Sequence, residues 1–362
     1  METSYSNKPY FFVPLSKRAD RRKALNQQNL LGADTYAGKL SIAIECVTPL
    51  HFGSGQIIFD ETTKRFIHSL LRENDKITLP GSSFKGMLRS VFEAISASCV
   101  LNSPRALPLK VETLGPCSNS SGLCPACSVF GRLSYKGKLR ISSFYSDMES
   151  DTLNIPQLEQ PFRTYPLPGR GEKNPRTGNE RLYYGDFHDI HGLNVARMTK
   201  ADFFKRKNRE PRSGGSFYGR KFYKHSHGWK VLIERPSKDY YECLPVGATL
   251  TGKITYQGFT EDELGALFFA LGLGWEQPIF HKLGYAKPAY FGSVKLTVIP
   301  EPLPRYEDKR MTAEEANRIA SLYYKKHKTA IEDAVCVFSQ EWSEIGDSMW
   351  IRQDGNDGKD GY

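Results

Sequence analysis

The fold is organised around the stretch Leu79-Pro-Gly-Ser-Ser-Phe-Lys-Gly-Met-Leu-Arg89, where a strand-like approach meets a helix-like run. Gly81 permits backbone conformations that other residues avoid, and Ser82 or Ser83 can cap the helix that follows. Apolar residues then recur at three- and four-residue spacing, which predicts one buried helix face. These residues are Phe84, Leu88, Val91, Phe92 and Ile95. We expect the helix to run from residue 83 to about residue 98.

The start of this helix also gathers groups that suit phosphate. Lys85 and Arg89 are four residues apart, so they lie on one side of the helix, near its free backbone donors. The hydroxyls of Ser82 and Ser83 stand beside them. We therefore hypothesise that these four residues bind phosphates. The alternative is an ordinary capped amphipathic helix with two solvated cations.

Two strand–helix–strand series follow one another along the chain. The expected strands cover residues 39–48, 137–145, 248–257 and 290–299. The first helix lies in the opening stretch, and the second begins at a capping box formed by Thr260 and Glu263. Two such units in one domain predict an α+β fold of the ferredoxin-like (RNA-recognition-motif-like) type, an antiparallel sheet with helices on one face. The open face of such a sheet is a common site for RNA.

Charge is concentrated in one segment. The 362-residue chain has a net charge of +10, and residues 161–230 contain 16 Lys and Arg against 6 Asp and Glu, so 16 − 6 = +10 resides there. The same segment holds twelve aromatic residues. Cations neutralise phosphates and rings stack on unpaired bases, which is typical of single-strand binders. The candidate RNA contacts are Arg220, Lys221, Tyr223 and His225; alternatively, many of the rings pack a small core of the insertion itself.

Three cysteines gather in the polar loop Pro116-Cys-Ser-Asn-Ser-Ser-Gly-Leu-Cys-Pro-Ala-Cys127. The spacing of Cys117, Cys124 and Cys127 suits chelation of one tetrahedral ion. Cys99 is our first choice for the fourth ligand, with His68 or His51 as alternatives. We expect a structural zinc site, because protein ligands can fill all four positions. The competing interpretation is a set of free or redox-reactive thiols.

Catalytic candidates are fewer. Asp60 and Glu61 follow the first expected strand, and a carboxylate there could hold Mg²⁺ or help to activate a ribose 2′-hydroxyl. Most loop carboxylates do neither. His225 and His227 offer metal-independent acid–base cleavage, or ordinary contacts to phosphate. No run of about 18 apolar residues and no signal-peptide segment is present, so we expect a soluble cytoplasmic protein with no membrane partner.

Assembled together, three motifs resemble the RAMP superfamily of CRISPR-associated proteins, and in particular the backbone subunits of type III effectors. They are the opening stretch, Cys124-Pro-Ala-Cys-Ser-Val-Phe-Gly131 and Gly284-Tyr-Ala-Lys-Pro-Ala-Tyr-Phe-Gly292. The resemblance covers most of residues 9–298. It implies a ferredoxin-like palm, a zinc-bearing insertion and a thumb loop that intercalates between guide and target RNA. It also implies a role in antiviral defence, with guide RNA, complementary target RNA, other RAMP subunits and the large effector subunit as partners.

The resemblance further assigns roles to single residues. Lys85, Arg89, Lys282 and Lys287 would contact the guide backbone, and Asp60 corresponds to an aspartate that cuts target RNA in many such subunits. The expected divisions are an N-terminal edge strand and basic arm (1–38), the first half of the palm (39–149) with its thumb loop (about 53–78) and zinc loop (about 99–131), a basic aromatic-rich insertion (150–245), the second half of the palm (246–299), and a C-terminal helix with a disordered tail (300–362). Two other functions stay open: a stand-alone guide-RNA-processing endoribonuclease that uses His225 or His227, and a zinc-stabilised single-strand RNA-binding protein without catalysis.

Overall fold

The computed structural model describes residues 10–22, 35–100, 114–118, 122–146, 152–156, 220–225, 239–275, 279–301 and 311–338. The predictions for His227, for the C-terminal tail and for most of the basic segment lie outside these residues. The described residues form a sheet-rich α+β structure, which confirms the predicted class.

Four strands form the centre of an eight-stranded sheet. They are β2 (Tyr36–Cys46), β8 (Phe144–Ser146), β12 (Thr249–Phe259) and β14 (Ser293–Glu301). Their order across the sheet is β14-β2-β12-β8, and each neighbouring pair is antiparallel. β2, the first strand of the first series, therefore lies between β12 and β14, the two strands of the second series.

Short strands extend the sheet at both edges. β13 (Phe280–Lys282) pairs with β14, and on the other side β6 (Lys76–Leu79) joins β8 to β5 (Arg72–Glu73). The strand expected over 137–145 is instead split between β7 (Leu139–Ile141) and β8. The split has a physical cause, because the Ser142 hydroxyl accepts a hydrogen bond from the Lys253 backbone N–H at 2.8 Å and so takes the place of a ladder bond.

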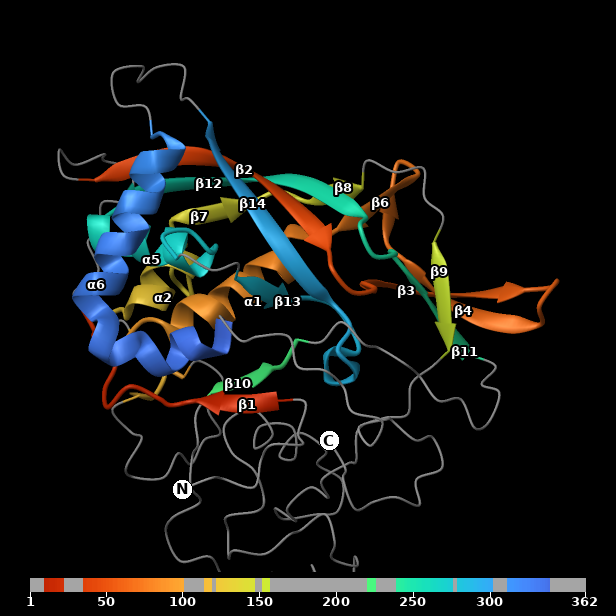
Figure 1. Cartoon of the computed structure of the whole chain (residues 1–362), viewed down its shortest axis with the longest axis horizontal. Helices are drawn as coiled ribbons and strands as arrows, with labels where there is room; N and C mark the ends of the chain where they lie inside the picture. The colour runs from red at the N-terminus through yellow and green to blue at the C-terminus, as the bar shows by residue number, and fades with distance from the viewer. Residues whose placement is uncertain are drawn as a thin grey trace, which may run out of the picture.

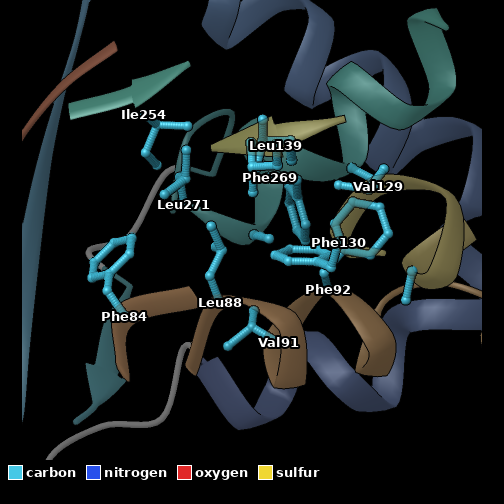
Figure 2. Close-up of a cluster of buried hydrophobic side chains, with 14 of the residues drawn as sticks. Phe84, Leu88, Val91, Phe92, Val129, Phe130, Leu139, Ile254, Phe269 and Leu271 are labelled. Atoms are coloured by element: carbon cyan, nitrogen blue, oxygen red, sulfur yellow. The ribbon is translucent and has the colours of Figure 1, made fainter. Parts of the chain in front are cut away.

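Helices α1 (Gly81–Ala94), α2 (Pro125–Phe130) and α5 (Glu261–Ala270) cover one face of the sheet (Figure 1). The longer α6 (Ala313–Phe338) packs against α5. Figure 2 shows side chains of α1, α2 and α5 meeting those of β7 and β12 in the core. The predicted apolar face of α1 is confirmed, since Phe84, Leu88, Val91, Phe92 and Ile95 are all buried.

The two main helices begin differently. At α5 the predicted capping box is confirmed: Thr260 Oγ1 accepts from the Glu263 N–H, and the Glu263 carboxylate accepts from the Thr260 N–H. At α1 the predicted cap is wrong, because Pro80 is the N-cap residue and no side chain caps the helix. Gly81 does not have a positive φ. It is required for space instead, since a Cβ there would lie 2.5 Å from the Ser142 carbonyl oxygen.

The opposite face of the sheet is open. Along β12, buried Leu250 and Ile254 alternate with exposed Thr251, Lys253 and Thr255. The same alternation runs along β2, whose inward residues are buried, and along β14, where Leu296 and Val298 are half-buried. The open face is therefore polar, as the half-buried strand pattern predicted.

A second, four-stranded sheet stands beside the first. It consists of β3 (Gly53–Asp60), β4 (Arg65–Leu70), β11 (Asp239–Cys243) and β9 (Leu153–Pro156). At the place of the expected thumb loop, about residues 53–78, the structure has regular strands instead: β3 and β4 form a hairpin that projects from the body (Figure 1). The local pattern does not show alternation, because both faces of the hairpin are exposed.

The N-terminal strand also pairs unexpectedly. β1 (Tyr10–Val13) forms an antiparallel pair with β10 (Arg220–Tyr223), from the end of the basic insertion. The predicted edge strand therefore exists, but it is not an edge of the large sheet. Among the described residues, no helix combines the length and the apolar character that crossing a membrane requires.

Candidate functional site

Four cysteines come together from the segment after α1, the loop before α2 and α2 itself. The sulfur atoms of Cys99, Cys117, Cys124 and Cys127 all lie within 4.8 Å of one another, and all four side chains are buried. Four thiolates at such distances suit a tetrahedral ion such as zinc. The alternative ligands His51 and His68 are not part of this group. Hydrogen bonds from Cys124 and Cys127 lower the pKa of Cys117, whereas hydrogen bonds with Cys117 raise the pKa of Cys99 and Cys127, so the thiols titrate as one group.

A buried charge triad supports this cysteine cluster. Glu93 accepts from Arg89 Nε at 2.8 Å and from an Arg220 guanidinium nitrogen at 2.5 Å. Arg89 also donates to the Gly131 carbonyl and lies 3.6 Å from the Cys127 sulfur. Arg220 donates to the carbonyl of Cys99 at 3.0 Å. The triad thus joins α1 and β10 to the segments that carry Cys99 and Cys127.

This geometry gives Arg89 and Arg220 protein partners, and their contact with RNA stays a prediction. Their side chains are only 18% and 10% exposed, and their donors are directed to protein acceptors. Each guanidinium instead orients the backbone or sulfur of a cysteine, the role that surrounding hydrogen bonds play at metal sites. Sequence reasoning missed Glu93, although its spacing of four from Arg89 is a recognisable signal for a helical ion pair.

The start of α1 keeps its polar groups accessible. Ser82 and Ser83 are exposed in the first turn, which contains no acidic residue. Lys85 is half-buried and makes no hydrogen bond or ion pair with the other described residues. Burial, and then the neighbouring Arg89, lower the pKa of Lys85. An uncapped helix start with a cation beside it is a favourable place for an anion.

A tight loop, residues 284–292, carries the last set of candidates. Gly284 and Gly292 have φ of +75° and +70°, and a Cβ on Gly292 would collide with the Leu283 carbonyl oxygen. Lys282 Nζ lies beneath this loop and donates to the carbonyls of Tyr290 and Phe291 at 2.9 and 3.2 Å. Burial lowers its pKa far below the ordinary value.

The two lysines of this region therefore differ. Lys282 holds the loop from inside by donating to two of its carbonyls, and its contact with the guide backbone stays a prediction. Lys287 begins the short 3₁₀ helix η4 (Lys287–Ala289), where burial lowers its pKa. It makes no ion pair with the residues that the structure describes, so it remains a candidate for phosphate.

His225 is packed below the same loop. Its Nδ1 lies 3.0 Å from Ser293 Oγ, and the side chain is buried. Burial, and then the charge of Lys282, lower the pKa of His225 to about 2. A histidine that stays neutral and inaccessible is poorly suited to acid–base cleavage. On the neighbouring strand β10, Lys221 lies over the Tyr223 ring at 5.4 Å.

Asp60 lies apart from these groups, at the turn of the β3–β4 hairpin. One carboxylate oxygen accepts from the Thr62 N–H at 2.9 Å, and the other accepts from the Thr63 hydroxyl at 2.6 Å. The Thr63 hydrogen bond is the main cause of the lowered pKa of Asp60. These contacts close the turn, which gives Asp60 a local structural role. Among the described residues, the cysteine cluster is the one group of three or more potential metal ligands.

Comparison with known proteins agrees with these features. The family model of the RAMP superfamily matches residues 43–277, which is more than half of the chain. The chain belongs to the RAMP superfamily of CRISPR-associated proteins, and its function is RNA binding in a CRISPR context. A search of curated proteins gave no match.

Proposed function

We propose that this protein is an RNA-holding subunit of a type III CRISPR ribonucleoprotein, where it binds guide RNA and sits on the guide–target duplex. The observation that carries the proposal is the uncapped start of α1, with exposed Ser82 and Ser83 and with Lys85 free of protein partners among the described residues. Phosphate oxygens would accept from the Ser82 N–H and from the Lys85 ammonium, because the Ser83 and Phe84 N–H groups already donate to the Pro80 carbonyl. Lys287 would add a second backbone contact.

The palm of this subunit is the central four-stranded layer. The order β14-β2-β12-β8, with α1 and α5 as connections between its strands, supports a ferredoxin-like assignment. The β3–β4 hairpin is the counterpart of the thumb. Its exposed Ile57, Ile58 and Phe59 support this role, since they are available to press against bases.

Zinc is the metal that we assign to the four cysteines. The all-sulfur donor set fills four positions and leaves none open for substrate, so the ion would hold the segment that follows α1 to the loop before α2 and to α2 itself. The charge of the ion would be balanced by the thiolates, while Arg89 offsets part of the remaining negative charge.

An RNA-binding titration tests the proposal. Affinity for a single-stranded guide is measured at several salt concentrations for the wild type, for Lys85→Ala and for Lys325→Ala, an exposed control on α6. Loss of one phosphate contact should weaken binding and reduce the salt slope by about 0.7. Lys325→Ala should change neither. Equal binding by Lys85→Ala and the wild type would remove the contact on which the proposal depends.

Target cleavage at Asp60 is a separate hypothesis, and two variants distinguish it from the turn role. Asparagine keeps the oxygen that accepts from Thr62 but loses the charge, whereas alanine loses both. If the assembled complex uses the Asp60 carboxylate to cut target RNA, both variants abolish cleavage. If Asp60 only closes the turn, Asp60→Asn cuts as the wild type does. Cleavage of repeat RNA by the isolated chain would instead favour the guide-processing function.

A further inference from the structure

A row of stacked rings crosses from the second sheet to the tight loop. His68 on β4 and Tyr241 on β11 are paired residues, and their rings stack at 4.4 Å with an interplanar angle of 8°. Tyr285, from loop 284–292, stacks on Tyr241 at 4.4 Å and 15°. His68 and Tyr285 make no ring contact with each other, although both are described, so they cover opposite faces of Tyr241. The row therefore ends at Tyr285.

Tyr285, at this end of the row, is partly exposed to solvent, with 38% of the residue's surface accessible. Strand pairing places Ile57 opposite His68 and Phe59 opposite Phe66, so these residues continue the same face of the sheet toward the hairpin. Phe59 and Phe66 are 46% and 40% exposed, and their rings lie 5.1 Å apart. Such an exposed aromatic strip indicates a binding surface.

The loop holds Tyr285 firmly in this position. The Tyr285 N–H donates to the His51 carbonyl at 2.9 Å, and the His51 ring meets the Tyr285 ring edge-on at 5.9 Å. Ala286 and Tyr290 have positive φ values of 57° and 66°, a backbone conformation that residues other than glycine rarely adopt. Strain of this kind concentrates at ligand sites, and a fixed ring loses little entropy when a ligand binds.

We propose that the exposed face of Tyr285 binds one unpaired nucleobase of RNA, which becomes the next ring in the row. The inference rests on the proposed function, because it takes RNA as the ligand and adds a base contact to the phosphate contacts. A base cannot enter between the rings, since their centroids are only 4.4 Å apart. It must add at the end, and a base inside a continuous duplex has no free face to offer.

The neighbouring groups favour a nucleotide over an apolar peptide. Lys287 is two residues from Tyr285 and makes no ion pair with the described residues. A nucleotide on Tyr285 would therefore bind at a loop that carries a cation. Stacking on an aromatic ring depends little on which base is present, so the site would select unpaired nucleotides without selecting a sequence.

The test combines Tyr285 variants with RNA that lacks a single base. A series of single-stranded guides, each with one abasic nucleotide, is titrated into the full-length wild type, Tyr285→Ala and Tyr285→Phe. For the wild type, we expect one position at which the missing base weakens binding by about 5- to 100-fold. Tyr285→Ala should lose the same factor with intact RNA and lose nothing further at that position. Tyr285→Phe should behave as the wild type.

Leu322→Ala is the matched control, because Leu322 is an exposed apolar residue on α6, outside the row of rings and the hairpin. It should leave the abasic profile unchanged. The inference is overturned if Tyr285→Ala binds every guide as tightly as the wild type. It is also overturned if the loss of affinity caused by Tyr285→Ala adds to the loss of affinity caused by the missing base. Thermal unfolding of each variant identifies a loss caused by misfolding; if Tyr285→Ala misfolds, Tyr285→Leu, which keeps an apolar side chain but lacks the ring, then decides by the same abasic comparison. If Lys85→Ala also binds guide RNA as the wild type does, the proposed function itself fails. If Lys85→Ala weakens binding but no abasic position weakens binding to the wild type, only this inference fails.

Discussion

Replacing Glu93 with alanine should strongly destabilise the protein. Glu93 is the shared acid of two buried guanidiniums, those of Arg89 and Arg220, at 2.8 and 2.5 Å. Its removal leaves two positive charges in a largely dry environment beside the cysteine cluster. Breaking a buried ion pair in this way costs about 3–5 kcal/mol. We therefore expect the free energy of unfolding in denaturant to fall by that amount in zinc-containing buffer.

A second measurement separates support of the metal from general packing. In competition with a chelator, zinc affinity of Glu93→Ala should fall by about 10- to 100-fold, as for other residues that orient metal ligands. The control is Glu315→Ala, which breaks the exposed Arg318–Glu315 pair, whose side chains are 56% and 39% exposed. This control should cost less than about 1 kcal/mol and leave zinc affinity unchanged. If Glu93→Ala costs no more than Glu315→Ala, the account of the triad is wrong.

Three further predictions follow from other parts of the structure. In denaturant unfolding, Gly292→Ala should destabilise the protein by at least about 2 kcal/mol, because it combines a positive φ with a collision at the Leu283 carbonyl. The control is Gly86→Ala, in the first half of α1, where a Cβ meets no other atom; it should be neutral or stabilising in the same assay. Burial lowers the pKa of His281 to about 4, so the fold favours the neutral ring, and stability should fall as the pH drops below about 6.5. The loss should reach about 2 kcal/mol by about pH 5, and His281→Gln should remove that part of the pH dependence. Cys117→Ser should remove bound zinc, measured by elemental analysis, and an unchanged zinc content would contradict the four-cysteine site.

Much of the fold follows from local patterns in the sequence. The apolar spacing of α1 and the capping box at Thr260 act within a few residues, so they are visible without a partner. The strand alternation around Ile42 and Ile254 likewise reports one buried sheet face. The cysteine cluster was predictable because its spacing is typical of metal ligands, and Cys99 stands at the end of the preceding helix.

The remaining features depend on contacts that are distant in sequence. Arg89 and Arg220 look like surface cations until Glu93 is seen between them. Lys282 looks equally available, but the loop carbonyls of Tyr290 and Phe291 take up its ammonium. The β3–β4 hairpin was missed because both of its faces are exposed, so its residues lack the alternation that marks a half-buried strand.

The central claim is that RNA phosphate binds at the start of α1. A structure of the full chain with bound guide RNA tests it most directly. We expect a backbone phosphate at the first turn of α1, within hydrogen-bonding distance of the Ser82 N–H and the Lys85 ammonium. A bound guide that leaves this turn empty, and that instead lies across the open face of β12 and β14, would contradict the account.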